Sequence, residues 1–411
     1  VEETLTKGVV VVTGGPGTGK TTTINLMIRC FEMEKMDIVL AAPTGRAAKR
    51  MTEATGYEAK TIHRLLEVSG GIEDGDSSHF EKNEDNPIEA DAVILDEMSM
   101  VDIHLMYSLL KAIVPGTRLI LVGDSNQLPS VGPGNVLKDI IDSKAFSVVR
   151  LSKIYRQAES SHIVLNAHKI NAGELITLDN KNKDFFFFEK KDVRSVMGAL
   201  VYLVKTRLPE YIGASPFEIQ VLTPMRKGEL GVEHLNEVLQ YYLNPASESK
   251  KEKEGRTGVF REGDKVMQVK NNYKLEWKIT NAKGFSIEEG LGVFNGDMGI
   301  IKQINTYSER ITVVFDENRE AEYPFSSLDE LELAYAITIH KSQGSEYPAV
   351  VLPLLSGPPI LCNRNLLYTA ITRAQKCVAI AGRQSMVEQM IHNETEQKRY
   401  SGLNDCLKEG L

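Results

Sequence analysis

Short apolar runs punctuate the first 150 residues of the chain at regular intervals. Each run is followed by a polar or glycine-bearing loop and then by helical sequence; the runs are Val9–Thr13, Ile38–Ala42, Ala92–Leu95 and Arg118–Val122. Continuous apolar runs of this length are typical of strands buried on both faces of a parallel sheet. The alternation predicts an α/β fold with a doubly wound sheet, whose chemistry lies at the C-terminal ends of the strands.

The same rhythm returns later in the chain. Strands are predicted at Phe185–Phe188 and Ile219–Thr223, and a helix from about Gly231 to Leu243. We expect the four phenylalanines to lie in a hydrophobic core, because a stacking role for such a run is rarer. Two segments interrupt the α/β pattern. Glycines and acidic residues between 66 and 87 predict an inserted hairpin, and turns such as Asn295-Gly296-Asp297 predict a small antiparallel barrel between 257 and about 328.

These patterns predict three units. The first α/β domain spans residues 1–155 with an insertion at 66–87, the second spans 156–250 and 329–411, and the barrel spans 251–328. A chain of 411 residues is too long for one ordinary core. Val1–Lys7 resembles the middle of a helix, so we expect the natural chain to begin further upstream.

Composition narrows the class of protein. No apolar run reaches the roughly 18 residues that a membrane helix needs, so we expect no membrane contact and a cytoplasmic location. The four cysteines are scattered without a CxxC pair, which favours reduced thiols over a zinc site. A formal net charge of −8 argues against bulk attraction to nucleic acid but permits a local basic groove.

A phosphate-binding loop follows the first predicted strand. The sequence Gly14-Gly15-Pro16-Gly17-Thr18-Gly19-Lys20-Thr21 fits GxxxxGK[ST] between a strand and a helix. Backbone amides at the start of a helix point at phosphate oxygens. The pattern predicts ATP contacts from Gly15, Pro16, Gly17, Thr18, Gly19, Lys20, Thr21 and Thr22. Lys20 is expected to reach the β- and γ-phosphates, and the Thr21 hydroxyl to bind Mg²⁺.

Two acidic residues end the strand at Ala92–Leu95. Asp96 is expected to hold Mg²⁺, and Glu97 to orient and deprotonate the attacking water. An Asp-Glu pair alone is a weak signal, but it becomes strong at a strand end downstream of a phosphate loop. Because the pair supplies a base for water, it favours hydrolysis over transfer to another substrate.

Further motifs follow in a fixed order. They are Ala42-Pro43-Thr44-Gly45-Arg46-Ala47-Ala48, Thr61-Ile62-His63-Arg64-Leu65, Gly123-Asp124-Ser125-Asn126-Gln127-Leu128-Pro129, Tyr155-Arg156-Gln157, Leu222-Thr223-Pro224-Met225-Arg226, Thr338-Ile339-His340-Lys341-Ser342-Gln343-Gly344-Ser345-Glu346 and Leu367-Tyr368-Thr369-Ala370-Ile371-Thr372-Arg373-Ala374. The series closely resembles the superfamily 1 helicases, and within them the RecD/TraA branch with its stand-alone RecD-like members. The resemblance extends from about residue 8 to 385.

The resemblance implies a fold and a set of roles. The fold would be two RecA-like P-loop NTPase motor domains with an inserted SH3-like barrel, labelled 2B, and a short 1B hairpin. Gln127 would sense the γ-phosphate, Arg156 and Arg373 would act as arginine fingers, and Gly344 and Glu346 would lie near the nucleotide's phosphate and sugar. The residues matching strand-contacting motifs are Thr44, Arg46, Thr61, His63, Thr338 and His340. His63 and His340 could instead be buried structural histidines.

The barrel carries its own candidate strand contacts. Five lysines surround Tyr273 and Trp277, namely Lys265, Lys270, Lys274, Lys278 and Lys283. Basic residues interleaved with aromatics are typical of backbone neutralisation combined with base stacking. A core role for Trp277 is an equal alternative. The acidity of the 66–87 insertion speaks against tight phosphate contact there.

The resemblance implies an ATP- and Mg²⁺-dependent DNA helicase that moves 5′-to-3′ on single-stranded DNA. It would act at single-strand/duplex junctions with recombination or repair proteins as partners. Three alternatives stay open from the residues alone: an RNA helicase, a nucleic-acid clamp that uses ATP only as a switch, and a P-loop kinase. The glutamine motif that reads adenine would lie upstream of Val1, so the preference for ATP rests on the resemblance. No cluster of carboxylates indicates a nuclease.

Overall fold

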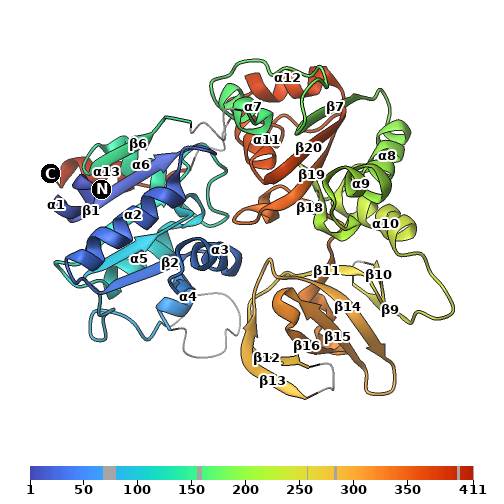
Figure 1. Ribbon diagram of the computed structural model, residues 1–411, viewed down its shortest axis with the longest axis horizontal. Helices are drawn as coiled ribbons and strands as arrows, with labels where there is room; N and C mark the ends of the chain where they lie inside the picture. The colour runs from blue at the N-terminus through green and yellow to red at the C-terminus, as the bar shows by residue number, and fades with distance from the viewer. Residues whose placement is uncertain (68–79, 155–159, 257, 282–284, 396–398, 411) are drawn as a thin grey trace.

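Three lobes make up the structure, a computed structural model that describes residues 1–67, 80–154, 160–256, 258–281, 285–395 and 399–410 (Figure 1). Two lobes are built on parallel sheets and the third on an antiparallel sheet. The predicted α/β class with two parallel-sheet domains and a β-rich unit is confirmed. No helix among the described residues is both long and apolar enough to cross a membrane.

The first domain is a six-stranded parallel sheet. In sheet order its strands are β3 (Ala59–Thr61), β2 (Ile38–Ala42), β4 (Ala92–Leu95), β5 (Arg118–Gly123), β1 (Val9–Gly14) and β6 (Ser147–Leu151). Its helices are α1 (Glu2–Thr6), α2 (Lys20–Met33), α3 (Gly45–Thr55), α4 (Ile62–Leu65), α5 (Ile103–Ala112) and α6 (Val136–Ser143), with a 3₁₀ turn η1 (Met98–Met100).

Alternation along the buried strands explains why both faces of this sheet are covered. Val10 and Val12 of β1 pack with Phe31 of α2 on one face. Val11, between them, packs with Leu109 of α5 and the apolar side of α6 on the other face. Successive side chains of a strand point to opposite faces, so an all-apolar strand requires helices on both. Strands β4 and β1 both flank β5, which brings the loops after these three strands to one edge.

The second domain is a five-stranded parallel sheet. In sheet order its strands are β18 (Ala336–Thr338), β8 (Ile219–Thr223), β19 (Tyr347–Leu354), β20 (Ala374–Gly382) and β7 (Phe185–Glu189). The helical elements are α7 (His162–Asn171), α8 (Val193–Tyr202), η2 (Leu203–Arg207), α9 (Leu208–Ile212), η3 (Pro216–Glu218), α10 (Val232–Leu243), η6 (His340–Ser342), α11 (Arg364–Ile371) and α12 (Gln384–His392). Phe185 and Phe187 are buried, and Phe186 and Phe188 pack against the core, which confirms the predicted core role.

The third lobe is a seven-stranded antiparallel sheet beside a two-stranded one. The larger sheet runs β13 (Ser286–Val293), β12 (Asn272–Thr280), β16 (Glu320–Pro324), β15 (Arg310–Phe315), β14 (Met298–Asn305), β11 (Lys265–Gln268) and β17 (Leu331–Leu333), with 3₁₀ turns η4 (Asp316–Asn318) and η5 (Phe325–Glu330). The smaller sheet pairs β9 (Glu252–Gly255) with β10 (Gly258–Arg261). The predicted antiparallel unit is present, and it extends past residue 328 because β17 pairs with β11.

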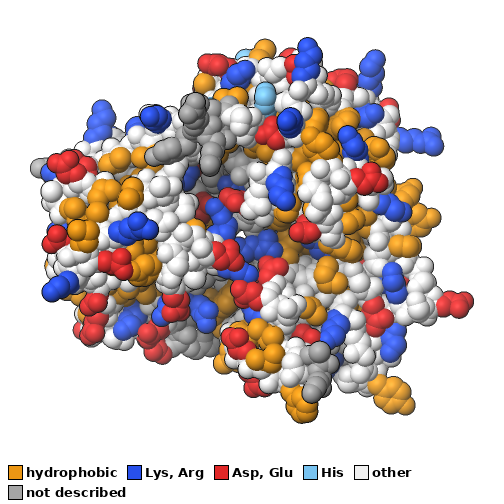
Figure 2. Space-filling view, in the orientation of Figure 1, with side chains coloured by type: hydrophobic (Ala, Val, Ile, Leu, Met, Phe, Trp, Pro, Cys, Tyr) orange, Lys and Arg blue, Asp and Glu red, His pale blue; other side chains and the backbone are white. Residues whose placement is uncertain are grey.

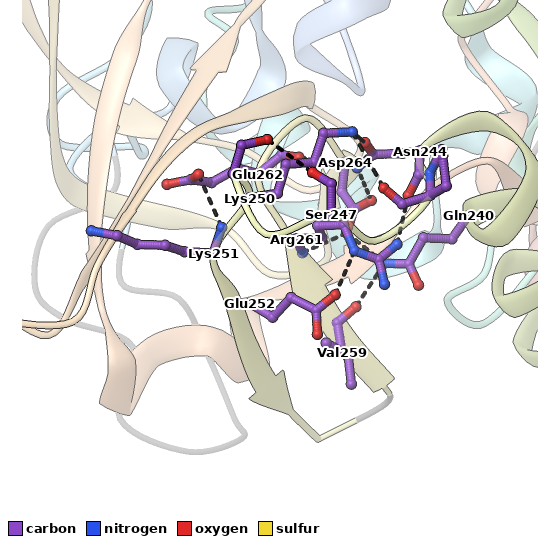
Figure 3. Close-up of polar contacts among 12 residues, drawn as sticks. Gln240, Asn244, Ser247, Lys250, Lys251, Glu252, Val259, Arg261, Glu262 and Asp264 are labelled. Atoms are coloured by element: carbon purple, nitrogen blue, oxygen red, sulfur yellow. Dashed lines mark hydrogen bonds and ion pairs between the residues drawn. The ribbon is translucent and has the colours of Figure 1, made fainter.

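A buried polar cluster ties this lobe to the second motor domain (Figure 3). The carboxylate of Asp264 accepts hydrogen bonds from Gln240 Nε2 at 2.6 Å and Asn244 Nδ2 at 2.7 Å, and from the hydroxyl of Tyr335 at 2.9 Å. Burial raises the pKa of Asp264, and these hydrogen bonds act against that rise. The hydrophobic core is also continuous from β8 and β19 into the antiparallel sheet. The lobe is therefore anchored to the second motor domain.

The end of the chain crosses to the first domain, unlike the predicted boundary, which gave all of 329–411 to the second. Helix α13 (Leu403–Glu409) packs on α6 through Leu403 and Leu407. Arg399 NH1 donates to the carbonyl oxygen of Gly134 at 3.0 Å. Figure 1 shows both termini at the first domain. Two apolar residues one helical turn apart explain the crossing, because they cover the exposed side of α6.

The predicted 66–87 hairpin lies mostly outside the described residues. At its base, Glu81 N donates to Glu67 O at 2.9 Å and Lys82 N to Leu66 O at 3.1 Å.

Candidate nucleotide site and strand interface

The phosphate-binding loop has the backbone shape that its glycines permit. Gly17 and Gly19 have φ of 71° and 82°, a region where L side chains are strained. Thr18 Oγ1 donates to Gly15 O at 2.8 Å and so holds the loop closed. Lys20 Nζ donates to Gly14 O at 2.6 Å and Gly15 O at 3.1 Å. The loop, including Pro16, wraps the start of α2.

The first turn of α2 presents the remaining predicted groups. Thr21 and Thr22 are exposed there. In the part of the chain that the structure describes, no side chain caps the start of this helix, whose cap residue is Gly19. Unpaired amides at a helix N-terminus favour an anion such as a phosphate.

The two carboxylates lie beside this loop at the end of β4. Asp96 Oδ1 accepts a hydrogen bond from the Glu97 amide at 2.8 Å, and Glu97 has a left-handed backbone with φ of 54°. Burial and the adjacent charge of Glu97 raise the pKa of Asp96 to about 6, and Lys20 and Arg50 oppose the rise. A carboxylate in this setting fits a divalent cation, which would relieve its desolvation. Thr21 and Asp96 are therefore suited to hold Mg²⁺.

The loop after β5 supplies a buried acid and an unpartnered acceptor. Asp124 is 1% exposed and accepts a hydrogen bond from Asn126 N at 3.0 Å. Gln127 Nε2 reaches Asp124 Oδ2 at 3.5 Å. Among the described residues, the Oε1 atom of Gln127 has no hydrogen-bond partner. A buried acceptor without a partner is costly, which is consistent with a ligand or water completing this site.

The second motor domain closes directly onto these loops. The hydroxyl of Tyr368 on α11 donates to Asp124 Oδ2 at 2.6 Å, and Leu128 N donates to Thr369 Oγ1 at 3.0 Å. Gln343 Nε2 donates to Leu128 O at 2.8 Å. On α7, His168 Nε2 lies 3.2 Å from Pro16 O of the phosphate loop.

A cavity of about 300 Å³ lies at this seam. Both domains line it; the residues include Thr13, Gly14, Gly15, Asn126, His168, Asn171 and Tyr368. Its size is at the lower end of the range for small-molecule sites. The side chains that complete the seam (Tyr368, Thr369, Gln343 and His168) were not singled out from the sequence. Tyr368, Thr369 and Gln343 do lie within the quoted motifs.

Arg373 lies at the N-terminal edge of the second sheet. It is 2% exposed, and its NH1 donates to Ser345 O at 3.2 Å. The parallel register pairs Tyr347 with Ala374, so Arg373 and Glu346 lie side by side just before their strands. Among the described residues the Nε atom of Arg373 has no partner. The other predicted finger, Arg156, lies outside the described residues.

The loop around Gly344 touches helix α3 of the first domain. Gly344 has φ of 71°, and a Cβ atom there would lie 2.7 Å from Thr44 Oγ1, so only glycine fits this close approach. Glu346 Oε1 lies 2.7 Å from Arg50 NH2, and Arg50 NH1 lies 3.6 Å from Glu97 Oε1. Arg50, which follows the quoted Ala42–Ala48 motif by two residues, was not among the predicted site residues.

The six predicted strand contacts divide into two groups. Arg46 and Thr61 line a groove of about 640 Å³ between the first motor domain and the antiparallel lobe, together with Lys60, Arg64 and Phe294. Figure 2 shows basic and acidic side chains gathered around a hollow where the lobes meet. Its cations and aromatic rings are of the kind that contact a single nucleic-acid strand. Five carboxylates also line the groove, those of Glu53, Glu288, Asp297, Asp316 and Glu317, and Arg46 lies 3.7 Å from Asp316.

The other four residues have other surroundings. Thr44 caps α3 by accepting from Ala47 N at 3.2 Å, and Thr338 Oγ1 accepts from Lys341 N at 3.3 Å. His63 packs against Phe80 with ring centroids 5.9 Å apart, and burial lowers the pKa of His63. His340 is exposed. Of the two groove residues, Thr61 also caps a helix, α4, by accepting from Arg64 N at 3.1 Å.

One of the barrel lysines contradicts its predicted role. Lys265 is 6% exposed, and its Nζ donates to Phe217 O at 2.7 Å and Gln220 Oε1 at 2.8 Å. Burial lowers the pKa of Lys265 to about 7. These hydrogen bonds attach β11 to the second domain, and they leave the ammonium group unable to reach a nucleic-acid strand. The sequence pattern failed here because β11 is buried on both faces.

The remaining barrel candidates lie nearer the surface. Lys274 and Lys278 line an outer groove of about 770 Å³ with Trp277. Trp277 also lines the groove of about 640 Å³ and is half-buried, with the Arg319 guanidinium 5.6 Å from its ring centroid. Lys270 forms an ion pair with Asp329 at 2.5 Å. Lys283 lies outside the described residues.

Two parallel-sheet domains that meet over one phosphate-binding loop define a two-domain P-loop NTPase. Family models agree with this class along the chain. Residues 1–133 match an AAA domain, 235–315 match the ATP-dependent RecD-like DNA helicase SH3 domain, and 333–381 match the UvrD-like helicase C-terminal domain.

Individual relatives narrow the family. The ATP-dependent RecD2 DNA helicase of Deinococcus radiodurans is 37% identical over 373 residues, covering 91% of this chain and 47% of that protein. The RecBCD enzyme subunit RecD of Mycolicibacterium smegmatis is 31% identical over 437 residues, covering 98% of this chain and 73% of that one. The chain belongs to the RecD-like family of superfamily 1 helicases. It spans about half the length of the RecD2 relative.

Solved structures agree on the fold. Pif1 helicase from Bacteroides, in complex with ADP-AlF3 and ssDNA, aligns with a TM-score of 0.52 at 20% identity, covering 95% of this chain and 94% of that one. A structure of two coordinating Pif1 helicases at forked dsDNA aligns with a TM-score of 0.52 at 20% identity, covering 92% and 91%.

Proposed function

We propose that this chain is the motor of an ATP-dependent DNA helicase. It hydrolyses ATP at the seam between its two parallel-sheet domains and uses the cycle to move along single-stranded DNA, 5′-to-3′, into single-strand/duplex junctions. The observation that carries the proposal is the direct contact of the second domain with the nucleotide loops of the first, through Tyr368 and Asp124 and through His168 and Pro16.

Each side of the seam then has a role in hydrolysis. On the first domain, Lys20 binds the β- and γ-phosphates, Glu97 orients and deprotonates the attacking water, and Gln127 senses the γ-phosphate. Thr21 and Asp96 would hold Mg²⁺, which would supply charge neutralisation at the phosphates.

Arg373, on the second domain, and Arg156 neutralise the charge that develops on the transferred phosphoryl group, and Gly344 and Glu346 border the nucleotide. Hydrolysis therefore needs both domains, which makes its rate depend on closure of the seam.

Closure at the seam changes the strand interface because the two sites share α3. This helix is capped by Thr44, carries Arg46 into the groove, and lies against the Gly344 loop. Cations, hydroxyls and aromatic rings in the groove grip phosphates and bases without reading sequence. A difference in strand affinity between nucleotide states is sufficient to ratchet the strand.

The test is ATP turnover measured with and without a single strand. The protein should hydrolyse ATP faster when oligo-dT is added, and Lys20→Ala should abolish turnover while its melting temperature stays near that of the parent. Arg373→Ala should do the same to turnover. Arg29→Ala, an exposed arginine on α2, is the matched control and should retain activity.

Two outcomes of this test would count against the proposal. Normal turnover in Lys20→Ala or Arg373→Ala would refute the assigned roles. Stimulation by an RNA strand but not by DNA would replace the DNA substrate with RNA, because only a 2′-OH contact separates the two.

A further inference from the structure

One arginine joins the two halves of the site through a pair of carboxylates. Arg50 lies on α3, near the middle of the helix. Its NH1 is 3.6 Å from Oε1 of Glu97 on the first domain, and its NH2 is 2.7 Å from Oε1 of Glu346 on the second. A planar guanidinium can hold two acceptors at once in a fixed geometry. The side chains of Glu97 and Glu346 therefore share one cation across the seam.

The surroundings of this bridge make it more than a surface ion pair. The side chain of Glu97 is 12% exposed, that of Glu346 29% and that of Arg50 38%. Ion pairs between fully exposed side chains contribute little, but this one lies where two domains exclude much of the water. Glu97 is also in a left-handed conformation, which a non-glycine residue adopts only when its neighbours hold it.

A second contact on α3 holds the same loop of the second domain, and Arg373 holds that loop from within its own domain. Arg46 NH1 donates to Ser345 Oγ at 3.3 Å, and Arg373 NH1 donates to Ser345 O at 3.2 Å. Residues four apart on a helix share one face, so Arg46 and Arg50 meet Ser345 and Glu346 together. The Ser345–Glu346 loop, which contacts Arg373, therefore docks on α3. Through Arg50, the same helix contacts Glu97.

We propose that Arg50 is a positioning residue that fixes the Glu97 carboxylate for hydrolysis once the Glu346 loop has docked on α3. The inference rests on the proposed function, in which Glu97 is the base. When the seam opens, Arg50 loses its ion pair with Glu346. The guanidinium is then free to move, so it no longer fixes the position of the Glu97 carboxylate. Hydrolysis is thereby restricted to the closed state, at the same helix that borders the strand groove.

Lysine would not replace Arg50 in this role. An ammonium carries the charge but lacks the planar fork that spans two carboxylates. Arg50→Lys should therefore restore only part of the activity lost in Arg50→Ala. A displacement of the base by about 1 Å can cost about 100-fold in rate, so we expect kcat to fall by about 10- to 100-fold in Arg50→Ala.

The experiment compares Arg50→Ala, Arg50→Lys, Glu97→Gln and the double variant Glu97→Gln/Arg50→Ala. Arg29→Ala is the control for loss of an arginine from the same domain. Steady-state ATP hydrolysis with saturating oligo-dT gives kcat and the KM for ATP. The expected result for Arg50→Ala is a lower kcat at a KM within about twofold of the parent, with no further fall when the change is added to Glu97→Gln.

A binding measurement provides a readout that does not depend on turnover. Fluorescent ADP is titrated with and without aluminium fluoride, which with ADP mimics the phosphoryl group in flight. Arg50→Ala should weaken binding of the aluminium fluoride complex by about tenfold and leave binding of ADP alone unchanged. Melting curves establish whether each variant is folded. If Arg50→Ala does not fold, Arg50→Lys takes its place in both measurements.

The outcomes separate the inference from the proposed function. A parent protein that binds the mimic but does not hydrolyse ATP would count against the proposed function, while the binding arm still tests Arg50. The inference is overturned if Arg50→Ala matches Arg29→Ala in both arms, if it changes only the KM, or if it lowers kcat by its full factor in the Glu97→Gln background.

Discussion

Replacing Asp96 by asparagine should stabilise the fold while it abolishes function. The carboxyl has its pKa raised from 3.8 to about 6, first by burial and then by Glu97. A raised pKa means that the folded state binds the proton more tightly than the unfolded state. The contribution to stability is therefore fully present below pH 4, and it is lost as the pH rises through 6. Above that pH the ionised carboxylate destabilises the fold.

The size of the effect follows from the shift. A difference of about 2 pKa units at about 1.36 kcal/mol per unit gives an upper limit of about 3 kcal/mol above pH 7. Asparagine has no charge to desolvate, and its Oδ1 can still accept from the Glu97 amide. In the absence of nucleotide and Mg²⁺, Asp96→Asn should therefore unfold at a higher urea concentration than the parent at pH 8, with the two midpoints converging near pH 4.

A matched control isolates the cause. Asp142→Asn changes an exposed aspartate on α6 and should leave the urea midpoint unchanged at both pH values. Mg²⁺ with a nucleotide should stabilise the parent more than Asp96→Asn and so narrow the difference at pH 8. A stability difference that does not vary with pH, or an Asp96→Asn variant that is less stable at pH 8, would refute the reasoning.

Two further changes test the seam and the junction. Tyr368→Phe removes the hydroxyl that donates to the buried Asp124. The closed seam should therefore lose about 1.5–3 kcal/mol of stability, and the kcat measured with a single strand should fall at least tenfold. An unchanged kcat would contradict this expectation. Burial lowers the pKa of Lys265 to about 7, so the parent protein should become more stable as the pH rises from 7 towards 10. The urea midpoint should show this gain in the parent and not in Lys265→Met. An equal gain in both proteins would show that another group is responsible.

The sequence was most informative where one strong local rule applied. The apolar runs placed β2, β4 and β8 at the residues observed, because a strand buried on both faces leaves little freedom in its composition. The phosphate loop was equally clear, since its glycines and Lys20 must occupy fixed positions between a strand and a helix. The resemblance to known helicases supplied the family and the two-domain arrangement.

Contacts between segments distant in sequence could not be read in the same way. Arg50 forms its ion pairs with residues 47 and 296 positions away, so no local pattern marks it. Lys265 looked like a surface cation until its strand proved to be buried. The crossing of α13 to the first domain depends on Leu403 and Leu407 finding α6, which a helical pattern alone does not specify.

The most direct test of the account is unwinding of a short DNA duplex that carries a single-stranded tail at either its 5′ or its 3′ side. We expect the protein to separate the 5′-tailed duplex in the presence of ATP and Mg²⁺, and Lys20→Ala to separate neither. Separation of the 3′-tailed duplex alone would reverse the proposed direction. Failure to separate either duplex, with ATP hydrolysis intact, would contradict the claim that closure of the seam moves a strand.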